Sequence, residues 1–484
     1  MEYDHELQAI LDITIALSAE SDHNKLFNMI LTKSMEISNC DAGTLYLLKD
    51  NKLEFRIMKT LSMNYDRGSD GSPIDIPPVE LREDHVCAYS VIHKESLNIE
   101  DVYDENDRFD FSGPRRYDSM TGFHTQSMIT IPLINSEGAA LGVLQLINAM
   151  DKDGKVIPFD KSLEQIIYAF ASQAAITITN MRYQQELIDQ MWSFAEALAT
   201  AIDERTPYNT THTRQVAKYC GMLADHFNKL YEEGQEKEYF SVNRKEQLVM
   251  GALLHDIGKL VTPLEVMNKA TRLNGRENDI HTRLELIKLY AKVDLLEGRI
   301  DAGQYEEMIH KADTAYEMAL NVNAKGFLDD ETYESLKEML SYEYVHEGKT
   351  YPFFTEEEKE CLSVRKGTLT AEERKIMENH VVVTSKILDK VHFGSYFKNT
   401  PTWAGQHHEC LDGSGYPNHK KGDELETDAR MIAVADICDA LLATDRPYKK
   451  PIPKDKAFDI MRDMADNGKI DKKIVGYMAE CLDA

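Results

Sequence analysis

The stretch that most limits how this chain can fold is a run from residue 161 to residue 204 that contains neither proline nor glycine. Its apolar residues recur at alternating steps of four and three, the spacing of one face of an α-helix. About forty residues would form a helix of roughly 60 Å. The apolar positions are Leu163, Ile167, Phe170, Ala174, Met181, Ile188, Met191, Ala195, Leu198 and Ile202, and Thr177 and Gln184 interrupt them.

Two interpretations fit this helix. It either packs on its own domain at each end, or it pairs with a second copy as a parallel coiled coil. An amphipathic helix of this length needs something that covers its apolar stripe, which favours the coiled coil. We therefore expect a homodimer joined through the connector 161–204.

The region before the connector, residues 1–160, mixes helical and strand patterns. Leu26, Ile30 and Met35 lie on one face of a helical stretch, and AGTLYLLKDNKLEFRIMKT then reads as two strands around a polar turn. SMITIPLINSEGAALGVLQLINA reads as a second strand pair around Asn135–Gly138. Strands flanked by helices predict a small α+β domain of the kind that senses ligands.

The region after the connector, residues 205–484, reads as almost entirely helical. Within it, residues 274–366 form a charged, acidic and helix-rich segment with few turn signals. A new helix then begins in GTLTAEERKIMENHV, where Thr370 and Glu373 have the spacing of a capping box. We expect an all-α bundle that contains residues 274–366 as a helical insertion.

Charge and cysteine content exclude several classes of protein. The formal net charge is −28 and the isoelectric point is about 5.0, so a nucleic acid polymer is not expected as a partner. The seven cysteines include no CxxC pair, which is typical of reduced thiols in the cytoplasm. No apolar run reaches the ~18 residues that span a membrane, and the N-terminus does not resemble a signal peptide. We expect a cytoplasmic protein without a membrane span.

The richest chemistry lies in LLHDIGKL, residues 253–260. His255 and Asp256 are adjacent, and Lys259 would share a helix face with Asp256 one turn away. A carboxylate can bridge two metal ions while a neighbouring imidazole binds one of them. A lone His-Asp pair occurs often by chance, so this motif needs support from elsewhere in the chain.

That support comes from four other segments. His212 begins a helical segment, His380 ends one, and the adjacent His407 and His408 open HHECLDGSGYP. Asp436 lies inside the apolar run IAVADICDA, where a charge is costly to bury unless it is paired or metal-bound. Five histidines and two aspartates on helices predict a dinuclear centre. Such nitrogen and oxygen ligands suit iron, manganese, nickel or zinc alike.

These motifs, with RMIAVADICDALLATDRPYKK, resemble the HD-GYP family of cyclic-dinucleotide phosphodiesterases within the HD superfamily, over residues 190–275 and 365–484. The resemblance implies an HD-type helical bundle, hydrolysis of cyclic di-GMP, and two divalent metal ions, iron or manganese. It implies one ion held by His212, His255, Asp256 and Asp436, and a second held by Asp256, His380, His407 and His408.

The resemblance also implies how substrate is held. Asp256 and Lys259 would be catalytic, with Lys259 neutralising a phosphate oxygen, while Arg446 and Lys449 would hold the distal phosphate. Asp439 is a candidate for a role behind the metal ligands. Gly413, Tyr416 and Pro417 would form a wall against a guanine.

Several alternatives stay open on this resemblance. The product is pGpG, GMP or both, and another cyclic nucleotide such as cyclic GMP-AMP is an alternative substrate. A receptor that binds without turnover is an alternative function. Some relatives bind a third metal through a carboxylate just before the first histidine, and YNTT at 208–211 lacks one, although Asp203 and Glu204 lie further back. We therefore expect two metals.

The N-terminal region resembles a GAF domain through GVLQLINA and DKDGKVIPFDKSLEQIIYAFASQAAITITN. The resemblance implies regulation by an unidentified GAF ligand. Cyclic-nucleotide-binding GAF domains often show Asn-Lys, then Phe, then Asp-Glu after three residues. Here Ala149 follows Asn148, and Leu163-Glu164 follows Phe159, so this signature is half kept. We interpret Cys40 and Cys87 as buried structural thiols. The insertion 274–366, which departs from the HD-GYP pattern, is either a surface elaboration or a lid or partner-binding arm.

Overall fold

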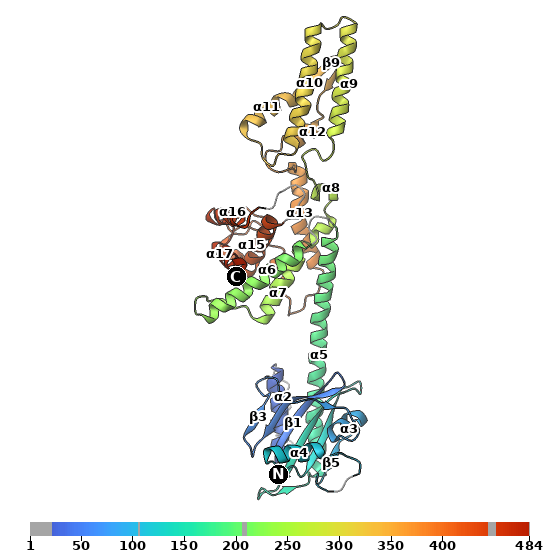
Figure 1. Cartoon of the computed structure of the whole chain (residues 1–484), viewed down its shortest axis with the longest axis vertical. Helices are drawn as coiled ribbons and strands as arrows, with labels where there is room; N and C mark the ends of the chain where they lie inside the picture. The colour runs from blue at the N-terminus through green and yellow to red at the C-terminus, as the bar shows by residue number, and fades with distance from the viewer. Residues whose placement is uncertain (1–21, 105–106, 206–210, 444–451, 484) are drawn as a thin grey trace. The chain divides into compact units, whose positions relative to one another are not determined.

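The computed structural model describes residues 22–104, 107–205, 211–443 and 452–483. Contacts divide the chain into two compact units, Met1–Asp189 and Gln190–Ala484. Each unit has its own core and is described by itself. Figure 1 labels the elements along the chain.

The first unit is built on one antiparallel sheet in the order β3-β2-β1-β7-β6-β5, with β4 paired to β2 and β8 paired to β7. Asp50 and Asn51 both have positive φ between β1 and β2, as a tight hairpin turn requires. The two predicted strand pairs are β1–β2 and β6–β7. The strands are β1 (Cys40–Lys49), β2 (Lys52–Thr60), β3 (Tyr65–Arg67), β4 (Val79–Glu80), β5 (Leu97–Ile99), β6 (Met128–Ile134), β7 (Ala140–Met150) and β8 (Val156–Ile157).

Helices cover both faces of this sheet. On one face, α2 (His23–Ser38) and the first part of α5 (Lys161–Asp203) bury Ile30 and Phe170 against Leu45 and Ile131. On the other face, α3 (Val86–His93) packs around Tyr46, and α4 (Ser112–Thr121) lies nearby over a cavity described below. The α+β fold predicted for this region is confirmed.

Helix α5 is continuous from Lys161 to Asp203, as its sequence pattern predicts. The face that we expected to form a coiled-coil seam is used within the chain at both ends. Ile167 and Ala174 are fully buried in the core of the first unit, and Ala195 and Ile202 are buried beyond Asp189. For these residues, packing of each end on its own domain is the better description. The homodimer stays a prediction.

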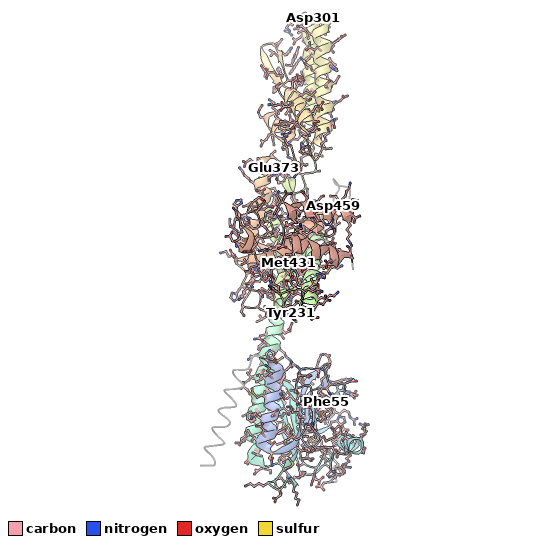
Figure 2. The ribbon with its side chains drawn as sticks, turned by 90° about the vertical axis from the view of Figure 1, so that its left-hand side faces the viewer. Phe55, Tyr231, Asp301, Glu373, Met431 and Asp459 are labelled. Atoms are coloured by element: carbon pink, nitrogen blue, oxygen red, sulfur yellow. The ribbon has the colours of Figure 1, made fainter. Side chains whose placement is uncertain are left out.

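The second unit is a helical bundle, which confirms the predicted fold class. Its core lies between α6, α7, α15, α16 and α17, and Met431 of α15, labelled in Figure 2, is fully buried in it. The elements are α6 (His212–Glu232), α7 (Val242–Leu254), η1 (Ile257–Val261), α8 (Leu264–Met267), α13 (Ala371–Leu388), α14 (Thr400–Ala404), η2 (Gly422–Glu424), α15 (Thr427–Leu442), α16 (Lys454–Asp466) and α17 (Lys472–Asp483).

The segment between α8 and α13 has a separate hydrophobic core. Asp301 caps α10 at the turn that follows α9, where Figure 2 labels it. The segment is mainly helical, as expected, and also contains a two-stranded hairpin that the sequence analysis did not predict. Its elements are α9 (Glu277–Leu296), α10 (Ala302–Asn323), α11 (Asp330–Leu340), β9 (Glu343–His346), β10 (Lys349–Pro352) and α12 (Glu356–Leu362).

Two buried cations hold the ends of this segment together. The fully buried Arg272 donates hydrogen bonds to the carbonyl oxygens of Val322 and Val364. Lys269 pairs with Glu373 at the start of α13, with an Nζ to Oε2 distance of 2.7 Å. Thr370 and Glu373 form the predicted capping box. The insertion is thereby fixed to the start of the helix that carries His380.

No helix among the described residues is both long and apolar enough to cross a membrane.

Candidate metal centre

The seven predicted ligands come from five separate places in the second unit. His212 is the first residue of α6, and His255 and Asp256 lie at the junction of α7 and η1. His380 lies on α13 and Asp436 on α15, while His407 and His408 follow α14. The fold brings all seven side chains together in three overlapping groups: His380, His407 and His408; His212, His255 and Asp436; and His255, Asp256 and His407.

One set of ligand atoms gathers around one oxygen of Asp256. The Nε2 atoms of His212 and His255 lie 3.5 Å and 3.3 Å from Asp256 Oδ2. Asp436 Oδ1 completes this group, 3.3 Å from His212 Nε2. These are the four residues that we expected to hold the first metal ion.

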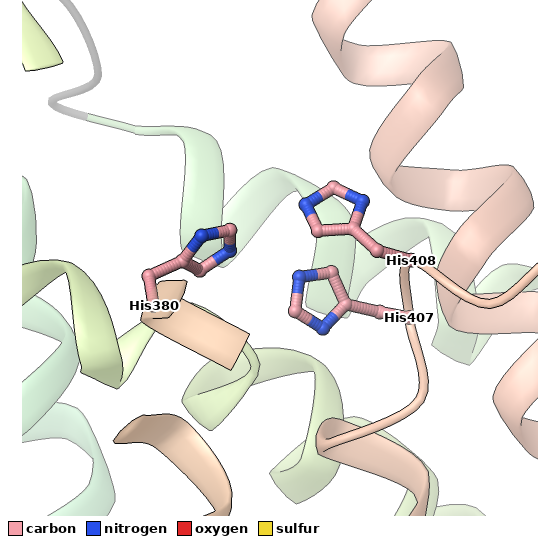
Figure 3. A group of neighbouring side chains, drawn as sticks. All are labelled: His380, His407 and His408. Carbon is pink, nitrogen blue, oxygen red and sulfur yellow. The ribbon is translucent and has the colours of Figure 1, made fainter. Parts of the chain in front are cut away.

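A second set gathers around the other oxygen of Asp256. His380 Nε2 lies 3.3 Å and His407 Nε2 lies 3.8 Å from Asp256 Oδ1. His408 Nδ1 lies 4.0 Å from Asp436 Oδ2. Figure 3 shows the rings of His407 and His408, from one loop, opposite the ring of His380. Asp256 therefore presents one oxygen to each set, as a bridging ligand would.

Hydrogen bonds fix which ring nitrogen faces the centre. The Nδ1 atoms of His255, His380 and His407 lie 2.6, 2.5 and 2.7 Å from the carbonyl oxygens of Ala252, Met377 and Ala404. Such a carbonyl accepts a hydrogen bond from Nδ1–H, which leaves Nε2 with its lone pair. Among the described residues these three Nε2 atoms and Asp256 Oδ1 are buried without a hydrogen-bond partner.

His212 is held by a carboxylate instead. Its Nδ1 lies 2.6 Å from Asp439 Oδ2, and both side chains are nearly buried. A carboxylate behind a metal-binding histidine fixes the ring and makes it a stronger ligand. Asp439 therefore contacts the ligand His212 from behind, and it is not itself one of the seven ligands.

The electrostatics of the centre also suit metal ions. Burial lowers the pKa of His407 well below its usual value, and lowers that of His408 to about 4, so both imidazoles stay neutral at pH 7. Burial alone would raise the pKa of Asp256, but Lys259 and His255 bring it well below the usual value. Neutral imidazoles and ionised carboxylates are the forms that bind metal. The residues present therefore fit a dinuclear metal site.

His212 differs from the other histidines. Burial would lower its pKa, but hydrogen bonds with Asp256, Asp436 and Asp439 raise it well above its usual value. A protonated ring balances the charge of these three carboxylates. A metal ion would take over that role, and binding at this position would release a proton.

Lys259 lies at the edge of the centre. Its Nζ contacts Asp256 Oδ2, and its side chain is partly exposed. The turn that carries it is held by Arg205, whose guanidinium donates to the carbonyl oxygens of Lys259 and Thr262 at 2.7 and 2.6 Å. The ammonium group is thus close enough to meet a phosphate bound at the centre.

A close contact between η1 and α13 joins the two ligand sets. A Cβ at Gly258 would lie 1.8 Å from the carbonyl oxygen of His380, so only glycine allows α13 to approach. Thr384 Oγ1 accepts from the amide of Gly258 at 2.9 Å and donates to the carbonyl oxygen of His255 at 3.0 Å. Sequence analysis did not single out either residue, although Gly258 lies within the HDIGK motif.

The turn after the paired histidines folds back on them. The ring of Tyr416 lies 4.9 Å from that of His408, and Gly413 has a φ of +80°. A Cβ at Gly415 would lie 2.5 Å from the carbonyl oxygen of His408. Glu409, missed in the sequence, is buried and accepts from the amides of Asn418 and Lys420, which holds the turn in place.

Four further positions considered in the sequence lie outside the two ligand sets or outside the described residues. Pro417 follows Tyr416 in the turn beside the centre. Arg446 and Lys449 lie outside the described residues. Asp203, considered for a third metal, accepts from Thr213 Oγ1 at 2.8 Å and pairs with Arg214.

Family models match most of the described chain. One, described as a GAF domain, matches residues 22–178, and two, each described as an HD domain, match residues 209–327 and 359–474. The chain carries a GAF domain and an HD domain. The resemblances that the motifs indicated are thus confirmed, and the predicted ligands lie in or between the two HD matches.

Relatives of the HD domain have names that describe cyclic dinucleotide hydrolysis. The chain is 44 % identical over 97 residues to "3'3'-cGAMP-specific phosphodiesterase 3" of Vibrio cholerae serotype O1, a match that covers 20 % of each chain. It is 22 % identical over 293 residues to "3'3'-cGAMP-specific phosphodiesterase 1" of the same organism, covering 60 % of this chain and 42 % of that one.

A third relative is the "Cyclic di-GMP phosphodiesterase" of Thermotoga maritima. It is 38 % identical over 101 residues, which covers 20 % of this chain and 25 % of the relative. The chain therefore matches less than half the length of each of these relatives.

Proposed function

We propose that the HD domain is a metal-dependent phosphodiesterase that hydrolyses cyclic di-GMP. The observation that carries this proposal is the position of Asp256, whose two oxygens face two separate sets of buried ligands. One ion would be held by His212, His255, Asp256 and Asp436, and the other by Asp256, His380, His407 and His408. Iron and manganese are the metals proposed, since both accept imidazole and carboxylate ligands.

Divalent ions held by these residues would supply an activated water molecule and positive charge for the oxygens of a phosphodiester. Hydrolysis would form a bond from water oxygen to phosphorus and break the bond from phosphorus to the 3′ oxygen, which takes up a proton. Lys259 would balance the charge on a non-bridging oxygen, because its ammonium group already lies beside Asp256. Asp256 and Lys259 are the residues that act directly on this step.

The turn of residues 413–417 would hold the nucleotide. Tyr416 lies beside His408 and would place a ring against a guanine, with Gly413 and Pro417 shaping the turn. Arg446 and Lys449 would hold the second phosphate, since a guanidinium and an ammonium suit that anion. The first product would be pGpG, and a second cut would give GMP.

Cyclic GMP-AMP is a second candidate substrate. It is favoured by the names of two Vibrio relatives, one of which shares 44 % identity with this chain over 97 residues. A receptor without turnover is disfavoured, because every residue expected to hold the two metal ions is present.

The GAF domain is proposed to regulate this activity through a bound small molecule. Its cavity of about 620 Å³ lies between the sheet and the helices α3 and α4. The walls are mainly apolar and aromatic, including Tyr46, Phe55 and Phe123, with Gln145 as a polar group. Burial raises the pKa of Cys87, which also lines the cavity, to about 12, so this thiol is a poor nucleophile for covalent attachment.

A cyclic nucleotide is not the ligand that this cavity favours. Asn148, part of the half-kept signature, donates to the carbonyl oxygen of His124 and accepts from the amide of Gln126, both at 2.7 Å. Of the cations on the wall, Arg82 and Lys59 are paired with Asp84 and Asp66, and Arg116 is exposed. We therefore propose a largely apolar ligand, since the amide of Gln145 is already engaged: its Oε1 accepts from the hydroxyl of Tyr46 and its Nε2 contacts Met128 Sδ, both at 2.9 Å. We also propose that the chain acts as a homodimer.

Measurement of turnover distinguishes an enzyme from a receptor, and one substrate from the other. Full-length protein would be loaded anaerobically with iron or manganese and given cyclic di-GMP, cyclic GMP-AMP and linear pGpG in turn. His407→Ala and Asp256→Ala should abolish hydrolysis, and the exposed Asp279→Asn should retain it as a matched control. Hydrolysis of cyclic GMP-AMP alone would show that this nucleotide, and not cyclic di-GMP, is the substrate. Tight binding with no turnover by fully metallated protein would contradict the enzymatic proposal.

A further inference from the structure

Arg205 is a charged side chain beside the metal centre to which the proposed mechanism gives no role. It lies two residues after the end of helix α5 at Asp203. Its guanidinium donates to two backbone carbonyl oxygens, that of Lys259 at 2.7 Å and that of Thr262 at 2.6 Å. Both terminal nitrogens of the side chain are therefore engaged with one short stretch of backbone. That stretch carries the lysine that would meet the substrate phosphate.

Both carbonyl groups lie at the end of the short helix η1, which ends at Val261. The last carbonyl groups of a helix lack some of their usual partners, and side chains often supply them. A guanidinium is a planar fork that donates to two acceptors at once, and hydrogen bonds from an ionised group are stronger than neutral ones. Lysine has a single donor nitrogen and could not serve both carbonyls in the same way. Arginine is therefore the side chain that suits this end of η1.

The segment that carries Asp256 and Lys259 is held at its two ends by different parts of the chain. At its start, Thr384 of α13 forms hydrogen bonds with the backbone on both sides of Asp256. At its end, Arg205 holds the carbonyl oxygen of Lys259 itself. The position of the metal ligand and the position of the lysine therefore depend on different contacts.

A small cavity shows how close the end of α5 comes to the centre. Its volume is about 10 Å³, roughly the space that one water molecule needs. The residues that line it include Asp203 and Arg205 together with Lys259 and two predicted metal ligands, His212 and Asp256. Arg205 therefore borders the centre itself and is not a remote support of the fold.

We propose that Arg205 is a positioning residue for phosphodiester hydrolysis and that it acts through Lys259. The proposal rests on the proposed function, in which the ammonium group of Lys259 balances the charge on a non-bridging phosphate oxygen. Because Arg205 fixes the carbonyl of Lys259, it sets where that ammonium group lies relative to a phosphate at the centre. A displacement of about 1 Å in such a group costs about 100-fold in rate.

A double-mutant cycle on the metal-loaded full chain, with cyclic di-GMP and cyclic GMP-AMP as substrates, tests this role. Arg205→Gln should lower kcat/KM by about 10- to 100-fold and keep the bound metal, because Thr384 still holds the backbone around Asp256. In a Lys259→Met background the same change should alter the rate by less than about twofold, since the group that Arg205 positions is gone. Arg205→Lys should recover only part of the rate.

Arg182→Gln is the matched control for Arg205→Gln. Arg182 is a residue of α5 whose guanidinium also donates to a backbone carbonyl, that of Leu48 at 3.2 Å, but it lies in the first unit. The control should keep kcat/KM within about twofold of the wild type. An unchanged rate in Arg205→Gln, loss of its metal, or an equal loss of rate in both backgrounds would overturn the proposal, because a merely structural role lowers activity whether or not Lys259 is present.

Hydrogen exchange of backbone amides gives a test that needs no turnover. The amide of Thr262 donates to the carbonyl oxygen of Lys259 at 3.1 Å, so loss of the guanidinium should speed exchange at the end of η1 by at least about tenfold. Exchange around Thr384 in α13 should stay as in the wild type. Unchanged exchange at the end of η1 would contradict the proposal. A wild type that hydrolyses neither nucleotide would refute the proposed function, and the exchange rates would still decide whether Arg205 holds this turn.

Discussion

At the scale of single residues, the centre depends on atoms that have no other partner. The Nε2 atoms of His255, His380 and His407 face inward because each Nδ1 is committed to a backbone carbonyl. The sequence could predict these ligands from their residue types and motifs. It could not predict the hydrogen bonds that orient them, because those bonds depend on where each helix turn ends.

Asp439 is a residue-scale test of that orientation. Asp439→Asn keeps the shape of the side chain but weakens its hydrogen bond with His212 Nδ1. We expect metal affinity to fall by about 10- to 100-fold, the usual effect of removing such a partner. Titration of metal-free protein with manganese would measure it. Unchanged affinity would mean that Asp439 plays no part in positioning His212.

His408 provides a test by pH. In the folded, metal-free protein its pKa is about 4, whereas an unfolded histidine titrates near 6.5. Below pH 6.5 the unfolded chain takes up a proton that the folded chain does not, so acid lowers the free energy of unfolding. From pH 6.5 to pH 5.5 the loss from this residue is about 1 kcal/mol.

Urea unfolding of the wild type and of His408→Gln at those two pH values isolates the contribution of His408 to the free energy of unfolding. Wild-type protein should lose about 1 kcal/mol more than the variant over that interval. Equal losses in the two proteins would show that His408 is not buried in its neutral form.

At the scale of elements, the contact between η1 and α13 decides whether the two ligand sets meet. Gly258→Ala would force the carbonyl oxygen of His380 away, because the added Cβ would lie 1.8 Å from it. We expect a loss of about 2–4 kcal/mol in the free energy of unfolding and impaired metal binding. Chemical denaturation and metal analysis would measure the two effects.

Gly221 on α6 is the matched control for that substitution. A Cβ there would have no neighbour closer than 3.8 Å, so Gly221→Ala should be neutral or stabilise by up to about 1 kcal/mol. If both alanine variants behave alike, the close approach of α13 to Gly258 has no energetic importance.

Helix α5 shows what periodicity can and cannot predict about an element. The absence of proline and glycine predicted a continuous helix, and it extends from Lys161 to Asp203. The pattern identified the face that contains Ile167 and Ala174 but assigned it to a partner, whereas both are buried within the first unit. Periodicity finds an apolar face, but only the tertiary structure shows what covers it.

At the scale of the whole molecule, the two units have separate cores and the candidate metal ligands belong to the second. Two thermal transitions are therefore expected in calorimetry. Ligands that bind only the folded state stabilise it, so removal of metal by a chelator should lower the transition of the HD domain alone. A chelator that shifts both transitions equally, or neither, would contradict a metal site confined to one unit.

The domain order could be predicted from local patterns, because GAF-like strands, a long helix and HD motifs occupy separate stretches. The hairpin β9–β10 could not, since its two-residue turn, Glu347-Gly348, gives little signal within a charged helical segment. The links of Arg272 to Val322 and Val364 join residues far apart in the chain, which no local pattern records. These links close the base of the insertion, and the pair of Lys269 with Glu373 fixes that base to the start of α13.

The number of metal ions per chain tests the central claim most directly. Full-length protein loaded anaerobically with manganese or iron, then freed of excess ion, would be analysed by plasma mass spectrometry beside Asp256→Asn and the control Asp279→Asn. The arrangement of ligands predicts two ions per chain in wild type and in Asp279→Asn, and loss of both in Asp256→Asn, because each oxygen of Asp256 serves one ligand set. One ion or none in wild type, or two retained in Asp256→Asn, would contradict a dinuclear centre bridged by this residue.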